Sequence, residues 1–410
     1  MHDIGKRIKQ LRKAKQFTLA ELAGEQLSKG MLSLIENGKA KPSIESLHYI
    51  ANRLGVEANS LLGEDHIDEL RAILNDIEKK YAEATNNEEY KAILMLIKPS
   101  IVNIKQNTYE SARLLDLYGR VTYHLNINAD DSVMKQAISH YQELNMINYM
   151  LNGYLHLTWR KFSQHQYEEA LAILQEAETV AMNQKHLVDH VSTLDLHYYF
   201  TIMFLALDDI EESMKYLQKG IEFSKKEKLF YRIDDLYRIM TFHAIMVQDE
   251  STAVYYLNKL QLFVDFTEDR QGQLLAAWVH CHYMNRLKNN YKGVLSFIQS
   301  KEKTFQKEMP EYIVYVQHEK SYALFHLGRF EEALEILQEL KVPDFLHHPY
   351  DLSFCYQTFA IRALCYEKLG NHEKAMIDVT ISYNHVKNFK KNIFQTFIFQ
   401  TYEEIIGIKP

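Results

Sequence analysis

The chain has 410 residues, a net charge of −7, and a composition that is 47% hydrophobic and 25% charged. This length exceeds what one compact core can organise, so two or more domains or an array of repeats are expected. Only 14 residues are Gly and 6 are Pro, which argues against turn-rich sandwiches and barrels and favours long helices.

The sequence contains no secretory signal and no run of about 18 apolar residues that can span a bilayer. Its three cysteines, Cys281, Cys355 and Cys365, follow no pairing pattern, as is usual in a reducing cytoplasm. The sequence therefore predicts a cytoplasmic protein without a membrane partner.

Residues 4–62 predict five short helices in an order that is typical of DNA-binding domains. A Thr or Ser cap precedes the second, third and fourth helices, and an Asn-Gly pair gives the third a left-handed end. The third helix opens after a tight turn, which is the pattern of a helix-turn-helix that lays this helix in a DNA major groove. The caps are Thr18, Ser28 and Ser43, the Asn-Gly pair is Asn37-Gly38, and residues 56–62 form the predicted fifth helix.

The segment from Ile4 to Leu62 resembles the helix-turn-helix of Cro/C1-type repressors. Arg12 and Glu36 fall where that family pairs an arginine of the first helix with a glutamate of the third. The stretch between Ala23 and Ser28 is one residue shorter than in the phage repressors, and Leu19 replaces the phosphate-contacting glutamine of many of them. The resemblance implies binding to double-stranded operator DNA. The positions that match the family's core are Leu22, Ala23, Leu32 and Ile35.

Helix geometry predicts which side chains of the third helix face DNA. Leu32 and Ile35 lie three residues apart and point into the domain, so the remaining face is directed outward. The free N–H groups after Ser28 can hold a phosphate, and Lys29 can bind the O6 and N7 atoms of guanine. For Met31 and Leu34, packing against the second and fourth helices remains an open alternative to DNA contact. For Lys39 and Lys41, which follow the helix, the open alternative is that they are simply solvated. The predicted DNA-contacting residues are Thr18, Ser28, Lys29, Gly30, Met31, Ser33, Leu34, Asn37, Lys39 and Lys41.

Charge is unevenly divided along the chain. Residues 1–62 contain ten Lys or Arg and six Asp or Glu, a net charge of about +4, so the other 348 residues carry about −11. A basic head attracts phosphate, whereas an acidic body is poorly suited to nucleic acid. We therefore expect the rest of the chain to bind something other than DNA.

A repeated phrase organises the chain after residue 65. Its clearest copy, Leu327 to Leu337, matches the turn and second helix of a tetratricopeptide repeat, with an aromatic residue two positions after the turn and an alanine three further on. Twelve residues before this anchoring alanine, where two helices press together, most copies carry a small residue. The anchors fall at positions 170, 213, 253, 294, 333 and 375, with weaker copies around Ile93 and Ala137. The earlier positions are Thr158, Thr201, Thr241, His282, Ser321 and Ala363.

Anchors spaced by 39 to 43 residues predict long helix pairs. Because one pair cannot bury its apolar face alone, the pairs are expected to stack into a right-handed superhelix. The predicted fold is all-α. It consists of a five-helix Cro/C1-type domain over residues 1–64, a linker helix over residues 65–85, and an array of degenerate tetratricopeptide repeats over residues 86–410.

A Cro/C1-type helix-turn-helix followed by long tetratricopeptide repeats resembles the RNPP regulators, the peptide-pheromone receptors of Gram-positive bacteria. The resemblance covers the whole chain. It is specific over residues 1–62 and general over the repeats, whose motifs any such array shares. It implies a homodimer formed through the repeats, with a higher oligomer on ligand binding left open. It also implies that a short signalling peptide binds in the concave groove and changes how the two DNA-binding heads are placed.

In a tetratricopeptide array, positions 2, 5, 9 and 12 of the first helix of each repeat point into the concave groove. Amides there can bond to an extended peptide backbone, arginines can hold a carboxylate, and aromatic rings can form apolar sub-pockets. An ordinary packing role is the open alternative for each. The predicted peptide-binding residues are Asn152, Tyr198, Asp235, Arg238, Tyr283, Arg286, His318, Tyr322 and Gln357, with Trp159, Phe242 and Glu367 at equivalent positions.

Motifs of catalysis are missing from the sequence, which contains no Gly-rich phosphate loop, G-x-S-x-G or CxxC. The run His280-Cys281-His282 contains three potential metal ligands, but residues two apart on a helix point in different directions. A packing role for these side chains is therefore favoured over a metal site. The pair His347-His348 lies in a Pro-flanked loop. We therefore expect no catalytic residues, no metal site and no cofactor.

Together these patterns predict a quorum-sensing transcription regulator that binds operator DNA and a short peptide. Two alternatives remain open. The array could be a scaffold for a folded partner such as a response regulator, or the chain could be a ligand-independent repressor of the phage type. A scaffold would bind a folded protein rather than a short peptide. A ligand-independent repressor would bind its operator with the same affinity whether or not cell extract is present.

Overall fold

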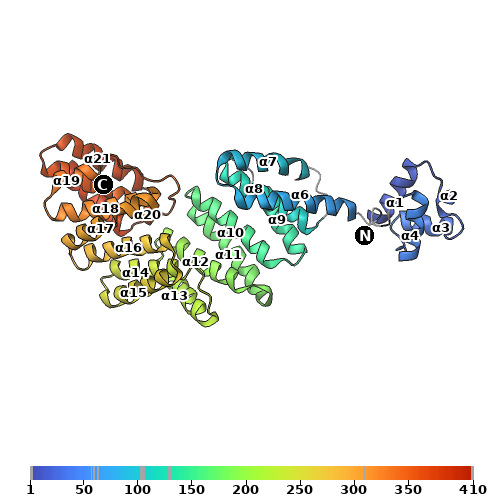
Figure 1. The fold of residues 1–410 in the computed structure, drawn as a ribbon, viewed down its shortest axis with the longest axis horizontal. Helices are drawn as coiled ribbons and strands as arrows, with labels where there is room; N and C mark the ends of the chain where they lie inside the picture. The colour runs from blue at the N-terminus through green and yellow to red at the C-terminus, as the bar shows by residue number, and fades with distance from the viewer. Residues whose placement is uncertain are drawn as a thin grey trace. The chain divides into compact units, whose positions relative to one another are not determined.

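The structure, a computed structural model, describes residues 3–56, 58, 61, 64–101, 107–127, 131–308 and 310–407. Within these ranges the chain forms helices and no strand, which confirms the predicted all-α class (Figure 1). The chain divides into two compact units, residues 1–146 and residues 147–410. In the described part of the chain, no helix is long and apolar enough to cross a membrane.

The first unit begins with four short helices around one apolar core. They are α1 (Asp3–Ala14), α2 (Leu19–Ala23), α3 (Lys29–Glu36) and α4 (Ile44–Leu54). The three predicted capping side chains each accept a hydrogen bond from the backbone N–H three residues on, which confirms where α2, α3 and α4 begin. Gly38, with a φ of 68°, is the left-handed stop predicted after α3. The fifth helix predicted over residues 56–62 falls largely outside the described residues, of which Ala58 and Leu61 are buried in the same core.

Close crossing of α1 and α3 depends on Gly5. A Cβ atom at this position would lie 2.0 Å from the carbonyl oxygen of Ile35, far inside van der Waals contact. Ile8, Leu32 and Ile50 are 0% exposed and fill the space around the crossing. This packing places the last turn of α3 against α1 and leaves the other side of α3 open.

Four further helices of the first unit pack in chain order. They are α6 (Glu64–Glu83), α7 (Asn87–Ile101), α8 (Tyr109–His124) and α9 (Ser132–Glu143). Helix α6 contacts both α7 and α8, and α8 contacts α9. Leu74 and Ile77 of α6 are buried in one core with Ile97 of α7 and Leu117 of α8. The segment predicted as a linker helix therefore shares the core of the helices that follow it.

The second unit is a series of helix pairs joined by short turns and followed by one last helix (Figure 1). The pairs are α10 (Ile147–Ser163) with α11 (Tyr167–Asn183), α12 (His190–Ala206) with α13 (Ile210–Glu227), α14 (Ile233–Met246) with α15 (Glu250–Thr267), α16 (Arg270–Arg286) with α17 (Tyr291–Glu308), α18 (Ile313–His326) with α19 (Phe330–Ile336), and α20 (Pro349–Lys368) with α21 (His372–Val386). The last helix is α22 (Ile393–Ile406), and two short 3-10 turns are η1 (Lys185–Leu187) and η2 (Pro310–Tyr312).

Each predicted repeat anchor is buried in the second helix of a pair. Ala170, Ser213, Ala253, Val294, Ala333 and Ala375 are all 0% exposed, as is Ala137 of α9, and Ile93 of α7 is 1% exposed. The six positions twelve residues earlier are at most 2% exposed. In one pair the two positions touch directly, because Ser213 Oγ donates a hydrogen bond of 2.9 Å to the carbonyl oxygen of Thr201. These observations confirm the predicted register.

In four of the five steps along the second unit, the first helices of successive pairs pack against one another on one side, whereas α12 and α14 are joined mainly through α13. Helix α10 contacts α12, α14 contacts α16, α16 contacts α18, and α18 contacts α20. Contacts between successive second helices are few or absent among the described residues. We call the side formed by α10, α12, α14, α16, α18 and α20 the inner side, because closer packing on one side curves the array toward it.

The array also closes on itself, since α20 contacts α12. The segment of residues 337–348, between α19 and α20, reaches the same place. His348 Nε2 donates to the carbonyl oxygen of Ile202 at 3.1 Å, and the Tyr167 hydroxyl donates to the carbonyl oxygen of His347 at 2.8 Å. Helix pairs far apart in sequence are thereby joined by direct hydrogen bonds.

Replacing an anchor should therefore destabilise the second unit. Ala333 has no exposed surface, so Ala333→Leu overfills a close helix contact and should lower the free energy of unfolding by about 1–3 kcal/mol. The matched change Glu335→Leu, at an exposed position of the same helix, should cost less than about 0.5 kcal/mol. Trp159 and Trp278 both lie in the second unit, so urea unfolding followed by tryptophan fluorescence measures this difference. Equal losses in both variants would contradict the register.

Candidate DNA interface and inner side of the repeat array

Helix α3 presents most of its predicted DNA-contacting side chains to solvent. Leu32 and Ile35 are 0% and 2% exposed and define its buried face. Met31 and Leu34 are each 44% exposed, so neither packs into the domain. Lys29 and Gly30 are exposed and Ser33 is partly buried. An exposed surface that combines a lysine with apolar side chains has the chemistry that base edges and thymine methyl groups require.

The N-terminus of α3 offers backbone donors. Ser28 Oγ accepts from Met31 N at 3.1 Å, and Ser28 O accepts from Leu32 N at 3.0 Å. The N–H groups of Lys29 and Gly30 have no acceptor within the helix, so they can bind an anion such as a DNA phosphate. Lys39 and Lys41 are exposed beyond the other end of α3, where they can add phosphate contacts.

Two predicted DNA contacts already hold hydrogen bonds within the domain. Thr18 forms a capping box with Glu21, and the backbone N–H of Thr18 lowers the pKa of the Glu21 carboxyl. Asn37 Nδ2 donates to Ser33 O at 2.8 Å, and Asn37 Oδ1 accepts from Lys9 Nζ at 3.4 Å. Thr18 and Asn37 are exposed, but their side chains help to hold α2 and α3 in shape as well.

The predicted ion pair joins α1 to α3. Arg12 Nε donates to Glu36 Oε1 at 2.7 Å, Arg12 Nη2 donates to Glu36 Oε2 at 2.9 Å, and Arg12 Nη1 donates to Phe17 O at 2.8 Å. The two side chains are 11% and 2% exposed, and the hydrogen bond to Glu36 raises the pKa of Arg12. The bidentate geometry confirms the predicted pairing and fixes the angle of α3 on α1.

Three of the predicted groove residues form a cluster on the inner side: Tyr198 of α12, and Asp235 and Arg238 of α14. Arg238 of α14 donates to Asp235, and the two side chains are 21% and 22% exposed. Although burial acts against the charge of Arg238, Asp235 raises its pKa. Arg232, just before α14, pairs with Asp195 and lies 4.3 Å from the centroid of the Tyr198 ring. Both arginines of this cluster therefore have a carboxylate partner.

Four other predicted groove residues meet across α16, α18 and α20. Arg286 Nη2 donates to Gln357 Oε1 at 3.0 Å and to His318 Nε2 at 3.2 Å. The guanidinium group lies 3.6 Å from the centroid of the Tyr322 ring. His318 and Gln357 are 0% and 1% exposed, whereas Arg286 and Tyr322 are partly exposed. A ligand on the inner side would therefore reach this cluster through Arg286 and Tyr322.

Burial lowers the pKa of His318 to about 3, so its ring is neutral. Nε2 accepts from Arg286, so the proton resides on Nδ1, which donates to Thr358 Oγ1 at 2.9 Å.

A buried carboxylate that the sequence did not single out lies beside this cluster. Glu319 is 0% exposed, and its Oε1 and Oε2 lie 2.7 Å from His282 Nδ1 and 2.7 Å from Asn285 Nδ2. Burial acts against its charge, but His282 outweighs that effect and holds the pKa of Glu319 at about 2. A charged residue inside the largely apolar α18 was the available sign of this site, although no spacing indicates its partners.

The other two predicted groove residues lie apart from both clusters. The Tyr283 hydroxyl donates to Glu250 Oε1 of α15 at 3.0 Å. Asn152 is an exposed residue of α10. Of the equivalent positions, Trp159 packs on His347, Phe242 packs on Trp278, and Glu367 accepts from His372. The nine predicted residues thus form two clusters and two separate positions.

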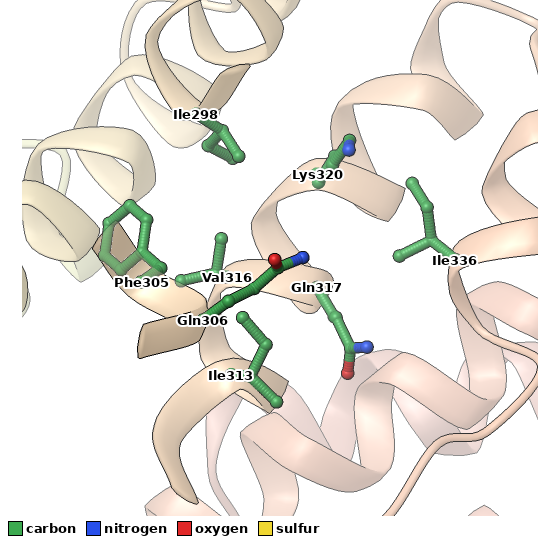
Figure 2. A pocket seen from close by; sticks show the side chains of 8 residues that line it. All are labelled: Ile298, Phe305, Gln306, Ile313, Val316, Gln317, Lys320 and Ile336. Carbon is green, nitrogen blue, oxygen red and sulfur yellow. The ribbon is translucent and has the colours of Figure 1, made fainter. Parts of the chain in front are cut away.

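Two cavities of the second unit are lined by residues that are not among the nine predicted peptide-binding residues. One, of about 200 Å³, lies between α17 and α18, with Ile336 of α19 at its edge (Figure 2). The other, of about 440 Å³, lies where the turn between α10 and α11 faces α20 and the end of α21, and includes Tyr167, Tyr356 and Phe389. Among the described residues, no group of three His, Cys, Asp or Glu side chains is placed to hold a metal ion.

Residues 5–64 match the family model described as a helix-turn-helix domain. The chain carries a helix-turn-helix domain. The immunity repressor protein of Bacillus phage phi105 is 35% identical over 79 residues, which cover 19% of this chain and 55% of the repressor. The match therefore spans about half the length of that curated relative.

Solved structures resemble the longer part of the chain. A Rap protein complexed with competence and sporulation factor aligns with a TM-score of 0.50 at 13% identity, over 83% of this chain and 98% of the Rap chain. That likeness shows a common fold. PlcR of Bacillus thuringiensis, solved with the peptide PapR7 and DNA, aligns with a TM-score of 0.35 at 18% identity, over 65% of this chain and 96% of PlcR.

Removing one partner of the Arg12–Glu36 pair should selectively destabilise the helix-turn-helix domain. Glu36→Ala leaves the largely buried Arg12 without its carboxylate, which should cost about 3–5 kcal/mol. Hydrogen–deuterium exchange of the full chain should show lost protection in α1 and α3 and unchanged protection in α10 to α21. The control Lys9→Ala removes only an exposed contact to Asn37 and should leave both regions unchanged. Retained protection in Glu36→Ala would show that the pair contributes little.

Proposed function

We propose that this chain is a cytoplasmic transcription regulator of the RNPP type, in which a repeat array controls a DNA-binding head. The observation that carries the proposal is the combination, in one chain, of a helix-turn-helix domain with an exposed α3 and a repeat array that has the fold of a Rap protein. In this proposal residues 1–64 bind operator DNA, α6 links the head to the array, and residues 86–410 sense a short peptide and dimerise.

The DNA-binding role is supported by charge and exposure. Residues 1–62 carry about +4 while the remainder carries about −11, so attraction to phosphate is concentrated in the head. On α3, Lys29, Met31 and Leu34 are available for base contacts. A homodimer would present two such helices to two half-sites of an operator.

The peptide-binding role is supported by the inner side of the array. Both charge signs, amides and aromatic rings occur there, which is the chemistry that an extended peptide needs. The Rap protein of similar fold was solved with competence and sporulation factor, and PlcR with the peptide PapR7 and DNA. By analogy, the array of this chain takes a short peptide as its ligand.

The DNA assignment makes distinct predictions for two lysines. Lys29→Ala should weaken binding to a selected site by about 1–3 kcal/mol and relax preference at one base pair, because Lys29 would contact a base edge. Lys39→Ala should weaken binding to all sequences alike and reduce its salt dependence. Both are measured with the full chain by fluorescence anisotropy, on a site selected from random DNA and its single-base variants. Unchanged base preferences in Lys29→Ala would contradict its place in the groove.

Titration of the full chain tests the complete function. If the next open reading frame downstream encodes a short secreted product, synthetic fragments of that product are first titrated by calorimetry, and the best is then added to operator-binding assays. We expect one fragment to bind and to change operator affinity at least tenfold, which requires about 1.4 kcal/mol of differential binding.

Binding without any change in operator affinity or oligomeric state would contradict the switch. If no peptide binds and a folded response regulator does, the array is a scaffold instead. If operator affinity responds to neither, the chain is a ligand-independent repressor.

A further inference from the structure

Four arginines of the second unit pair with carboxylates, and Arg286 does not. The four pairs are Arg232 with Asp195, Arg238 with Asp235, Arg329 with Glu332, and Arg362 with Asp378. Arg286 forms no ion pair with any described residue. Its two hydrogen-bond acceptors, Gln357 Oε1 and His318 Nε2, are both neutral, because burial keeps the His318 ring unprotonated.

The other groups around Arg286 do not supply the missing negative charge. Tyr322 lies beneath the guanidinium group, and its ring packs at a tilt of 55° on that of His326, whose pKa is lowered by burial and by Arg286 itself. Tyr291 also stacks with His326, with ring centroids 4.8 Å apart. Arg286 therefore lies among neutral aromatic rings.

Glu319 interacts electrostatically with Arg286, but its carboxylate is engaged elsewhere. Oε1 is bound to His282 and Oε2 to Asn285. This carboxylate is also 0% exposed and fixed between α16 and α18. It cannot leave its partners for Arg286 without stranding them, which costs more than the new contact would return.

The donors of Arg286 are only partly used. Its Nη2 makes both hydrogen bonds, while Nε is buried without an acceptor and Nη1 has none among the described residues. Nε is enclosed by the protein, whereas Nη1 is not buried and is the donor that a ligand on the inner side can reach. The guanidinium is also held in place by Tyr322, Gln357 and His318, so little freedom remains to be lost when an anion binds.

We propose that Arg286 binds a carboxylate of the peptide ligand, supplied by the peptide's C terminus or by an Asp or Glu side chain. The inference rests on the proposed peptide-sensing function and makes its ligand class more specific. Among the two arginines that the sequence predicts for carboxylate binding, Arg238 is already neutralised by Asp235. The role therefore falls to Arg286, whose planar group is suited to a carboxylate.

Four degenerate heptapeptide libraries test this with the wild-type full chain. Two have a free C-terminal carboxylate and two are C-terminal amides, and one of each kind omits Asp and Glu. Peptides retained by the protein are quantified by mass spectrometry. We expect retention to fall about tenfold when the relevant carboxylate is removed, as is typical for loss of a charge-assisted hydrogen bond. A loss caused by amidation identifies the C terminus as the source, and a loss caused by omitting Asp and Glu identifies the side chain.

Equal retention of all four libraries would overturn the carboxylate assignment while leaving peptide sensing intact. No retention of any library would overturn peptide sensing itself, and this inference with it. The two failures are therefore distinguishable without any variant.

Variants then locate the preference on Arg286. Arg286→Gln should abolish the difference between the libraries, and Arg286→Lys should keep part of it, because a lysine retains the charge but not the planar fork. The matched control Arg329→Gln removes an arginine that is exposed and paired with Glu332, and should keep the full preference. Thermal unfolding by circular dichroism checks that each variant is folded. A preference that persists unchanged in folded Arg286→Gln would overturn the proposal.

Discussion

Close packing at one fully buried anchor residue in every helix pair is the constraint on which the array depends. Ala170, Ala253, Ala333 and Ala375 have no exposed surface, so a larger side chain at any of these four positions would overfill the contact between the two helices. Each pair is stable only because the next pair covers it. Stacking in this way draws the first helices together on the inner side, and any polar residue placed there must find a partner or be desolvated at a cost.

On the inner side, some polar groups are fully paired and others keep an unused hydrogen-bond donor. Glu319 is satisfied by His282 and Asn285 although it has no exposed surface. Asp235 and Arg238 neutralise one another at partly exposed positions. Arg286 alone among the arginines discussed has only neutral acceptors and an unused Nη1 donor. The burial that stabilises the stack thus also determines which polar groups remain available to a ligand.

Features that depend on local spacing could be predicted from the sequence. The helix caps, the repeat register and the pairing of Arg12 with Glu36 each follow from a fixed pattern of residues, and the structure confirms them. The accessibility of the inner residues could not be predicted in this way. Counting positions from the anchor directs His318 and Gln357 inward, but it does not reveal that α18 and α20 approach closely enough to bury both.

The contacts that close the array between distant repeats could not be predicted from the sequence either. The hydrogen bond between Tyr167 and His347 joins positions 180 residues apart, and the one between Arg286 and Gln357 spans 71. Such contacts depend on the small rotation between successive pairs, which accumulates along the array and leaves no periodic mark in the sequence. The sequence placed the pair His347-His348 in a Pro-flanked loop, but it gave no sign that this loop is hydrogen-bonded to α12.

Closure of this kind gives a ligand a physical means of acting on the array. Arg286 contacts residues of α18 and α20 while belonging to α16, so an anion bound to it would interact with three successive repeats at once. A ligand shifts a conformational equilibrium only by the difference between its affinities for the two arrangements. An arginine whose charge is unpaired gains most from an anion in the arrangement that holds Tyr322 and Gln357 in place around it. The same three helices connect to the point where α20 meets α12, so a preference for one placement of α20 would also bias the closure of the array.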